Sequence, residues 1–291
     1  MQAVGFKLGL IDGLHERKRT SCEEVGDQVS PTSDSEQAER SSGSRIAVID
    51  KAVRVLDALL HAPKGLTPTE VAVTTGFNRS TAFRLLTSLE QAGLLCKDEL
   101  SGRYRLGPRL LQYGEGVRAG MGLIDVAEST LRKLSGSTRQ SVSFAIREGF
   151  GARCLLRIPG PEVESFAWKV GEWLPMHLGA APQALLSALS HADLDRFLLL
   201  QEGERRTRHG LLTEKDVRDE VANTRRRGWS LNREGLTAGV TSLGAVVPNA
   251  VGTPVCAISV AGLEHHYRGD GLEETAVAVT SAAAELGRLL R

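Results

Sequence analysis

Between residues 45 and 93, apolar side chains recur at the spacing of helices rather than of strands. A first helix should end near His61, and its apolar face carries Val48, Ala52, Val55, Leu56 and Leu59. Thr67 and Glu70 have the spacing of a capping box, which predicts a second, short helix that runs to about Thr75. The pattern therefore predicts two helices joined by a turn, with a third to follow.

Asn78 is expected to cap this third helix, which should run from Arg79 to about Gln91 and end at Gly93. One face of the helix is apolar and carries Ala82, Leu85, Leu86, Leu89 and Ala92. The opposite face is short-chained and polar, with Ser80, Arg84, Thr87 and Gln91. Phe83 lies off the centre of the apolar face, and we expect it to pack against the hairpin or the first helix rather than to stack on bases.

Two short strands follow the third helix, at residues 94–97 and 104–106, with a turn at Ser101 and Gly102. Three helices followed by a basic hairpin are the plan of a winged helix-turn-helix. Residues 109–120 then read as a connecting helix that two glycines weaken.

The rest of the chain mixes helices and strands. Alternating stretches predict strands at 142–146, 154–158, 241–247 and 255–260. Helical patterns occur at 183–189, 214–227 and 275–290. This order, with hairpins, predicts an α+β domain built on an antiparallel sheet.

Composition and charge place these segments in two domains. The chain has 291 residues, and 41% of them are hydrophobic, which is ample for two cores. Residues 1–44 are rich in Ser and acidic residues and predict a disordered tail. The net charge of the whole chain is +1, but residues 45–108 alone carry +3. The positive excess therefore lies in the helix-turn-helix segment.

Several classes of protein are not expected from this sequence. No apolar run is long enough to cross a membrane, and no secretory signal is recognisable, so we expect a cytoplasmic protein. The four cysteines are scattered, and no metal-ligand spacing or cofactor motif occurs. No catalytic motif occurs either, so we expect no cofactor, no metal and no catalytic residue.

The polar face of the third helix has the chemistry that reads DNA. We expect Arg84 and Thr87 to face the major groove, and Ser80 and Thr81 to contact phosphates at the helix start. Further backbone contacts are expected from Arg79 and, in the wing, from Lys97, Arg103 and Arg105. The alternative is a solvated helix in a protein-interaction domain.

An ordered set of segments resembles the IclR family of bacterial transcriptional regulators. The set comprises 66–72, 80–86, 102–107, 174–177, 227–229 and 257–262. The resemblance implies a winged helix-turn-helix domain at 45–108, a linker helix at 109–121 and a GAF-like α/β effector domain at 122–291. It also implies that a homodimer or tetramer binds operator double-stranded DNA. From the lack of a long apolar run, we expect no role at a membrane. An apolar seam for dimerisation is available at Leu110, Leu111, Val117, Leu123, Ile124 and Val126. Packing within the domain is the alternative for all six, above all for Ile124 and Val126.

The resemblance further implies a pocket for a small organic metabolite in the effector domain. The matching positions are Met176, Ala180, Ala181, Asn232, Ser242, Ser259 and Ala261. The family usually has Gly-Lys where this chain has Pro182-Gln183, and a frequent Asp is replaced by Asn232. We expect a ligand-responsive repressor of a catabolic or metabolic operon. The alternatives are an activator, a ligand-independent regulator, or a hydrolase that uses Ser242 or Ser259.

Overall fold

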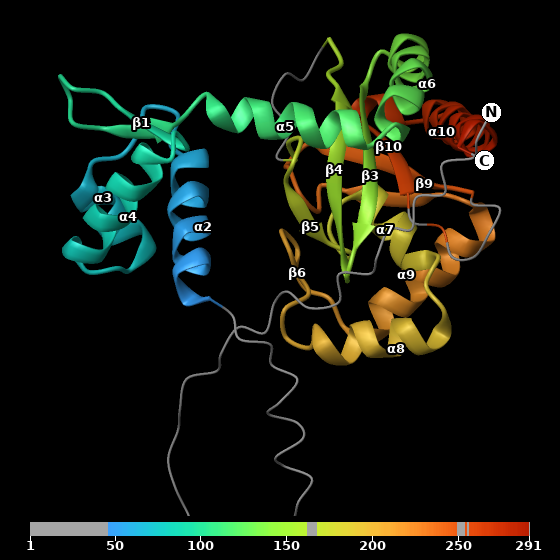
Figure 1. Cartoon of the computed structure of the whole chain (residues 1–291). Helices are drawn as coiled ribbons and strands as arrows, with labels where there is room; N and C mark the ends of the chain where they lie inside the picture. Colours follow the sequence, from blue (N-terminus) through green and yellow to red (C-terminus); the bar gives the residue numbers. More distant parts are fainter. Residues whose placement is uncertain (1–45, 162–167, 249–253, 255, 291) are drawn as a thin grey trace, which may run out of the picture. The chain divides into compact units, whose positions relative to one another are not determined.

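The computed structural model describes residues 46–161, 168–248, 254 and 256–290 (Figure 1). Contacts between residues divide the chain into two compact units that separate between Gly120 and Met121. The tail expected at residues 1–44 lies outside the described residues. In the ranges described, no helix is long and apolar enough to cross a membrane.

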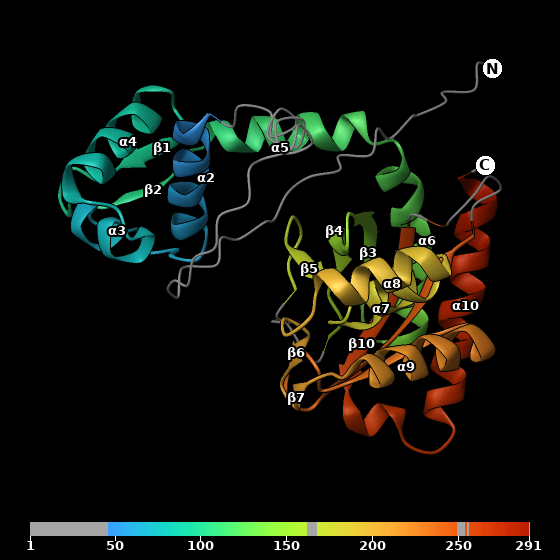
Figure 2. The same cartoon turned by 90° about the horizontal axis from the view of Figure 1, so that it is seen from below.

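The N-terminal unit has the predicted winged helix-turn-helix architecture (Figure 2). Its elements are α2 (Ala47–Leu60), α3 (Pro68–Thr75), α4 (Arg79–Gln91), β1 (Leu95–Lys97), β2 (Tyr104–Leu106) and α5 (Arg109–Gly120). The two strands pair antiparallel, with Leu95 opposite Leu106. α5 begins where the connecting helix was predicted, and none of its residues is buried.

The helix starts are set by the predicted caps. The Thr67 hydroxyl accepts a hydrogen bond from the Glu70 backbone N–H, and the Glu70 carboxylate accepts one from the Thr67 N–H at 2.7 Å. This closes the capping box at the start of α3. The Asn78 side-chain oxygen accepts from the Thr81 N–H at 2.8 Å and caps α4. Between the two helices, Gly76 takes the left-handed conformation of a tight turn, with φ of 69°.

The leucine face of α4 forms the core of this unit with α2, α3 and the hairpin. The buried residues are Val55, Leu59, Val71, Ala72, Ala82, Leu85, Leu86, Leu89, Leu95 and Tyr104. Ala92 was predicted on the apolar face of this helix, and that prediction was wrong. The residue lies past the last turn of α4 and is exposed. The prediction for Phe83 was also wrong: its side chain is 55% exposed and does not belong to the core.

A close backbone approach attaches the wing to the helices. Leu66 and Tyr104 exchange two backbone hydrogen bonds, of 3.0 and 2.8 Å, and so add a one-residue strand to the hairpin. Gly65 precedes this bridge with φ of +77°. A Cβ atom at Gly65 would lie 2.6 Å from the Tyr104 carbonyl oxygen, so only glycine fits.

The C-terminal unit is built on a six-stranded antiparallel sheet with the order β5-β4-β3-β10-β9-β8. Its strands are β3 (Ser141–Glu148), β4 (Gly151–Ile158), β5 (Trp173–Pro175), β8 (Ser230–Arg233), β9 (Val240–Val247) and β10 (Cys256–Leu263). A second, two-stranded sheet consists of β6 (Arg206–Thr207) and β7 (Gly210–Leu211). The helices are α6 (Leu123–Thr138), α7 (Ala180–Ser187), α8 (His191–Leu200), α9 (Glu214–Arg227) and α10 (Gly271–Leu289), with a 3-10 turn at Glu264–Tyr267. The predicted α+β class with an antiparallel sheet is confirmed.

Helices cover both faces of this sheet (Figures 1 and 2). On one face, Phe144, Leu243 and Ile258 belong to a core shared with α6 and α10. On the other face, Ala145, Cys154 and Ala257 belong to a core shared with α7, α8 and α9. Successive residues of a strand point to opposite faces, and β3, β4, β9 and β10 contribute to both cores.

Several elements of this unit differ from the sequence prediction. α9 has the predicted bounds, whereas α7 begins three residues earlier than expected. The sequence interpretation did not anticipate α6, α8, β5 or β8, which are short or interrupted by polar residues. Ile124, expected in a dimer seam, is instead buried in the core of its own unit. The alternative of packing within the domain therefore holds for Ile124.

His177 is a buried polar residue between β5 and α7, with only 2% of its surface exposed. Burial lowers the pKa of its imidazole to about 4. The nearby Arg205 guanidinium also lowers this pKa, while a hydrogen bond with the Arg206 backbone opposes the shift. His177 is therefore neutral in the folded protein at neutral pH.

The substitution Gly65→Ala should destabilise the N-terminal unit by more than about 2 kcal/mol, because the new Cβ collides with the Tyr104 carbonyl. Gly102→Ala is the matched control: Gly102 also has a positive φ, of +65°, but no atom lies within 4 Å of its Cβ position. The control should cost about 1 kcal/mol. Urea unfolding of the two variants measures the difference. Equal losses would contradict the collision.

The stability of the C-terminal unit should fall as the pH decreases from about 7 towards 4. In this range His177 binds a proton in the unfolded chain, where its pKa is near 6.5, but not in the folded chain, where it is about 4. Protonation of this one group should lower the free energy of unfolding by about 3 kcal/mol between pH 7 and pH 4. Urea unfolding from pH 7.5 to 4.5 should show a weaker pH dependence for His177→Gln than for the wild type. Parallel profiles would refute the assignment.

Candidate functional site

The exposed face of α4 is the first candidate site. Arg79, Ser80 and Arg84 are exposed, and Thr81 and Thr87 are half-buried. Within the part of the chain that the structure describes, neither guanidinium on α4 has a hydrogen-bond or ion-pair partner. Both positive charges are therefore available to an anionic ligand. α4 carries no acidic residue before Glu90, so nothing in its first two turns repels phosphate.

The buried face fixes the direction in which Arg84 points. Leu85 and Leu86 follow Arg84 directly and are buried in the core, so the arginine must point away from α2 and α3. Ser80 lies one turn before Arg84 on the same face. The first turn of α4 also presents backbone N–H groups, of which Asn78 caps the one at Thr81. Hydroxyls, backbone donors and an arginine therefore share one exposed surface.

The positive charges of the wing are partly neutralised by carboxylates, which the sequence analysis did not anticipate. The Arg103 guanidinium donates to the Gly65 carbonyl at 2.8 Å and to both Glu70 carboxylate oxygens at 3.0 and 3.2 Å. Thr67 hydrogen bonds, together with Arg103, hold the pKa of Glu70 below its usual value. Glu70 therefore stays ionised, and Arg103 joins the wing to α3.

The other two wing cations also face carboxylates. Lys97 lies 3.7 Å from Glu99, and Arg105 lies 3.5 Å from Asp98. Hydrogen bonds from Ser101 lower the pKa of Asp98, with a smaller contribution from Arg105. These pairs are exposed and therefore weak. They nevertheless reduce the positive charge that the wing offers to phosphate, and α4 has the stronger uncompensated charge.

The second candidate site lies on the sheet of the C-terminal unit. The register places Asn232 on β8 opposite Ser242 on β9, and Ser242 opposite Ala261 on β10. Leu243 of β9 belongs to the core on the α6 and α10 side, so Ser242 points to the α7 side. Three of the seven predicted effector residues therefore form one row across three strands.

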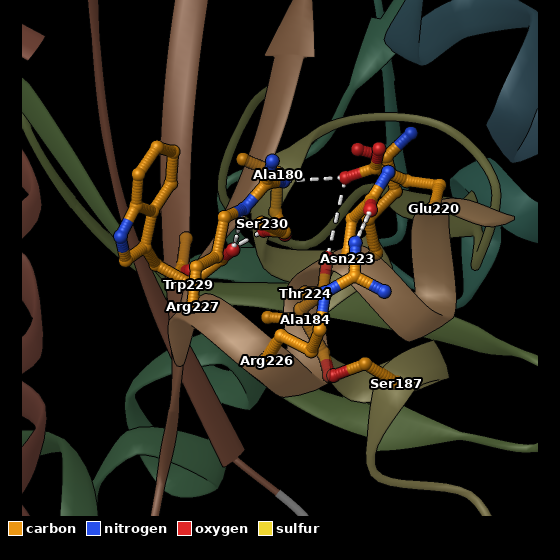
Figure 3. A network of polar contacts seen from close by, with 12 residues as sticks. Ala180, Ala184, Ser187, Glu220, Asn223, Thr224, Arg226, Arg227, Trp229 and Ser230 are labelled. Atoms are coloured by element: carbon orange, nitrogen blue, oxygen red, sulfur yellow. Dashed lines mark hydrogen bonds and ion pairs between the residues drawn. The ribbon is translucent and has the colours of Figure 1, made fainter.

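The N-terminus of α7 rests on the next row of the same face. Ser230 donates its hydroxyl to the Ala180 carbonyl at 2.6 Å (Figure 3). A Cβ atom at Gly244 would lie 2.5 Å from the same carbonyl oxygen, so glycine permits this approach. Ser259 pairs with Gly244 in the register. The structure thus brings Ala180 and Ser259 to one small area of the sheet.

The first turn of α7 offers two backbone donors. No side chain caps this helix, and Gly179 at its N-cap has φ of 81°. Pro182 has no backbone N–H, so the N–H groups of Ala180 and Ala181 are the donors of this turn. The Gln183 amide donates to the His177 carbonyl at 3.1 Å and thus holds the preceding loop.

Met176 and Arg157 change the predicted set of effector residues. Met176 is fully buried in the core beneath α7, and Ala180 and Ala181 at the start of that helix are buried as well. Arg157, which the sequence interpretation did not single out, is half-buried on β4 and pairs with Ser143 in the register. Ser143 pairs in turn with Ser259. The only sequence signal for Arg157 was a charge inside an apolar strand pattern.

Comparisons with known proteins match both units. The helix-turn-helix domain model of the IclR family matches residues 48–99. The model of the bacterial transcriptional regulator IclR C-terminal domain matches residues 116–288, which is more than half of the chain.

Curated relatives and solved structures agree with these matches. The HTH-type transcriptional regulator Rv1719 of Mycobacterium tuberculosis is 32% identical over 77% of this chain and 85% of its own length. The transcriptional repressor IclR of Escherichia coli is 23% identical over 83% of this chain and 89% of its own length. A crystal structure of an IclR homologue from Microbacterium hydrocarbonoxydans, complexed with 4-hydroxybenzoate, has a TM-score of 0.69 at 21% identity. That alignment covers 84% of this chain and 99% of the homologue.

These matches span both units, and the relatives are regulators of transcription. The helix-turn-helix domain implies DNA as the macromolecular ligand. The chain belongs to the IclR family of bacterial transcriptional regulators.

Proposed function

We propose that this regulator represses a catabolic or metabolic operon by binding operator DNA through α4, and that a small organic metabolite changes this binding. One observation carries the proposal: Arg84 is exposed, without a partner in the described chain, on the face of α4 opposite the buried leucines. An arginine in this position can donate two hydrogen bonds to a guanine edge in the major groove.

The remaining contacts follow from the geometry of α4. Thr87 lies one turn after Arg84 and reaches the same groove, while Ser80 and Thr81 donate to phosphates at the helix start. Arg79 contacts the DNA backbone. Lys97 and Arg105 contribute weaker phosphate contacts, because Glu99 and Asp98 partly compensate them. Arg103 supports the wing and contributes least to binding.

We expect the chain to dimerise through the exposed apolar surface of α5. Leu111, Tyr113 and Val117 are exposed on this helix. Burying them against a second copy of the chain removes apolar surface from water and doubles the number of DNA contacts. A dimer would place two copies of α4 in successive major grooves, about 34 Å apart or a multiple of that distance.

The proposed effector site is the area of sheet next to the first turn of α7. Its backbone donors, at Ala180 and Ala181, favour a carboxylate, and the positive end of the helix dipole adds to this preference. Ser242, Ser259 and Ala261 have short side chains and lie on the two neighbouring strands β9 and β10, where they would contact such a ligand. Asn232 and the half-buried Arg157 supply polar groups at the two sides. The 4-hydroxybenzoate complex of the homologue supports an aromatic acid as one probe.

The alternatives make different predictions. An activator or a ligand-independent regulator would use the same α4 surface, so only the response to metabolites and the sign of regulation would differ. A hydrolase would need a base beside Ser242 or Ser259. The register neighbours of these serines are Asn232, Ala261, Gly244 and Ser143, none of which is a base. The described surroundings therefore favour binding over catalysis.

The substitution Arg84→Ala should weaken specific DNA binding by about 1–3 kcal/mol for each subunit, because it removes the proposed base contact. Gel retardation of the DNA upstream of the protein's own gene, at a fixed salt concentration, measures the loss. Arg288→Ala is the matched control, since it removes an exposed arginine from the C-terminal unit. Arg84 is exposed, so the variant should keep its fold and its oligomeric state in gel filtration. Retardation equal to that of the wild type would refute the proposed orientation of α4.

The substitution Ser242→Leu should abolish the response to metabolites and leave DNA binding intact, because the larger side chain fills the proposed site. A thermal-shift screen of the full chain with 4-hydroxybenzoate and short carboxylic acids identifies the ligand. Binding at a hundredfold excess over the dissociation constant should stabilise the wild type by about 2.7 kcal/mol.

Arg84→Ala serves as the reciprocal control in this screen, since it should keep the thermal shift and lose DNA binding. Failure of every carboxylic acid to stabilise the wild type would contradict the organic-acid site. A shift that Ser242→Leu retains would place the ligand elsewhere. Neither result would affect the DNA-binding proposal.

A further inference from the structure

Phe83 is an exposed aromatic residue on the helix that we assign to the major groove. Its side chain is 55% exposed and lies outside the core of the N-terminal unit. The residues on either side of it in sequence have opposite environments: Ala82 is buried and Arg84 is exposed. Phe83 therefore stands at the edge where the leucine face of α4 meets its polar face.

The neighbours of Phe83 on the helix surface are polar or cationic. Arg79 lies four residues before Phe83, Ser80 three residues before it and Thr87 four residues after it, which are the spacings of contact on a helix. Arg79 has no partner within the described residues. A protein partner would have to bury this unpaired charge in order to cover the ring, whereas a duplex would neutralise it.

The major groove offers one apolar group that fits such a ring. Thymine carries a C5-methyl group on its groove edge, and phenylalanine is among the side chains that contact it. This contact leaves the bases stacked, whereas insertion between bases would require unstacking. A phenylalanine beside Arg84 can thus recognise a thymine next to the base that the arginine contacts.

We propose that Phe83 determines part of the operator sequence by packing on a thymine C5-methyl group in the major groove. The inference rests on the proposed DNA-binding role of α4. The two proposals can fail separately. Arg84→Ala tests whether α4 binds DNA, whereas Phe83→Ala tests whether the protein distinguishes thymine at a neighbouring base pair. The proposed contact is to the thymine C5-methyl group, which can be removed from the DNA without any change in base pairing.

The experiment compares thymine with deoxyuridine, which lacks only that methyl group. The wild-type protein first selects its tightest duplex from a random-sequence library. The duplex is then made with deoxyuridine at each thymine in turn. Replacement at the contacted position should weaken wild-type binding about fourfold, the value of one buried methyl group. Phe83→Ala should bind the thymine duplex more weakly and should no longer distinguish the two duplexes.

Leu100→Ala is the matched control, because Leu100 is a fully exposed apolar residue of the same unit at the tip of the wing. This variant should keep the fourfold preference for thymine. Two results would overturn the inference: no preference for thymine in the wild type, or a preference that Phe83→Ala retains. If the wild-type protein selected no duplex from the library, both the proposed function and this inference would be overturned.

Discussion

Burial of the leucine face of α4 against α2 and α3 is the contact on which the DNA-binding surface depends. Ala82, Leu85, Leu86 and Leu89 leave water on this face, and each leucine contributes about 1.5–3 kcal/mol. Once this face is buried, the helix cannot rotate without exposing it. The same packing therefore holds Arg84 outward, although no hydrogen bond or ion pair in the described chain positions its guanidinium.

The wing and α4 divide the positive charge of the N-terminal unit unequally. Arg103 is tied to Glu70 and the Gly65 carbonyl, and Lys97 and Arg105 lie near carboxylates. Glu70 has two roles, because it closes the capping box of α3 and also anchors the wing. The wing is thus tied to α3, and α4 offers more uncompensated positive charge to DNA than the wing does.

The two faces of the sheet in the C-terminal unit differ near the first turn of α7. One face is filled with large apolar side chains against α6 and α10. The other carries small residues near the first turn of α7, where Gly244 and Ser230 allow the Ala180 backbone to lie directly on the sheet. This second face also has an apolar core, shared with α7, α8 and α9, so both faces stabilise the sheet. The small residues lie where we propose the effector site.

The sequence by itself determined the features that neighbouring residues decide. The caps of α3 and α4, the turn at Gly76, the hairpin and the α+β class follow from local hydrogen bonding and from periodicity, which act within a few residues. Only the tertiary structure decided which residues distant in sequence meet. It joined Arg103 to Glu70, buried Ile124 and Met176 in the cores, aligned Asn232, Ser242 and Ala261 across three strands, and left Phe83 in solvent. Pairing and burial depend on what packs against a residue, and local periodicity does not contain that information.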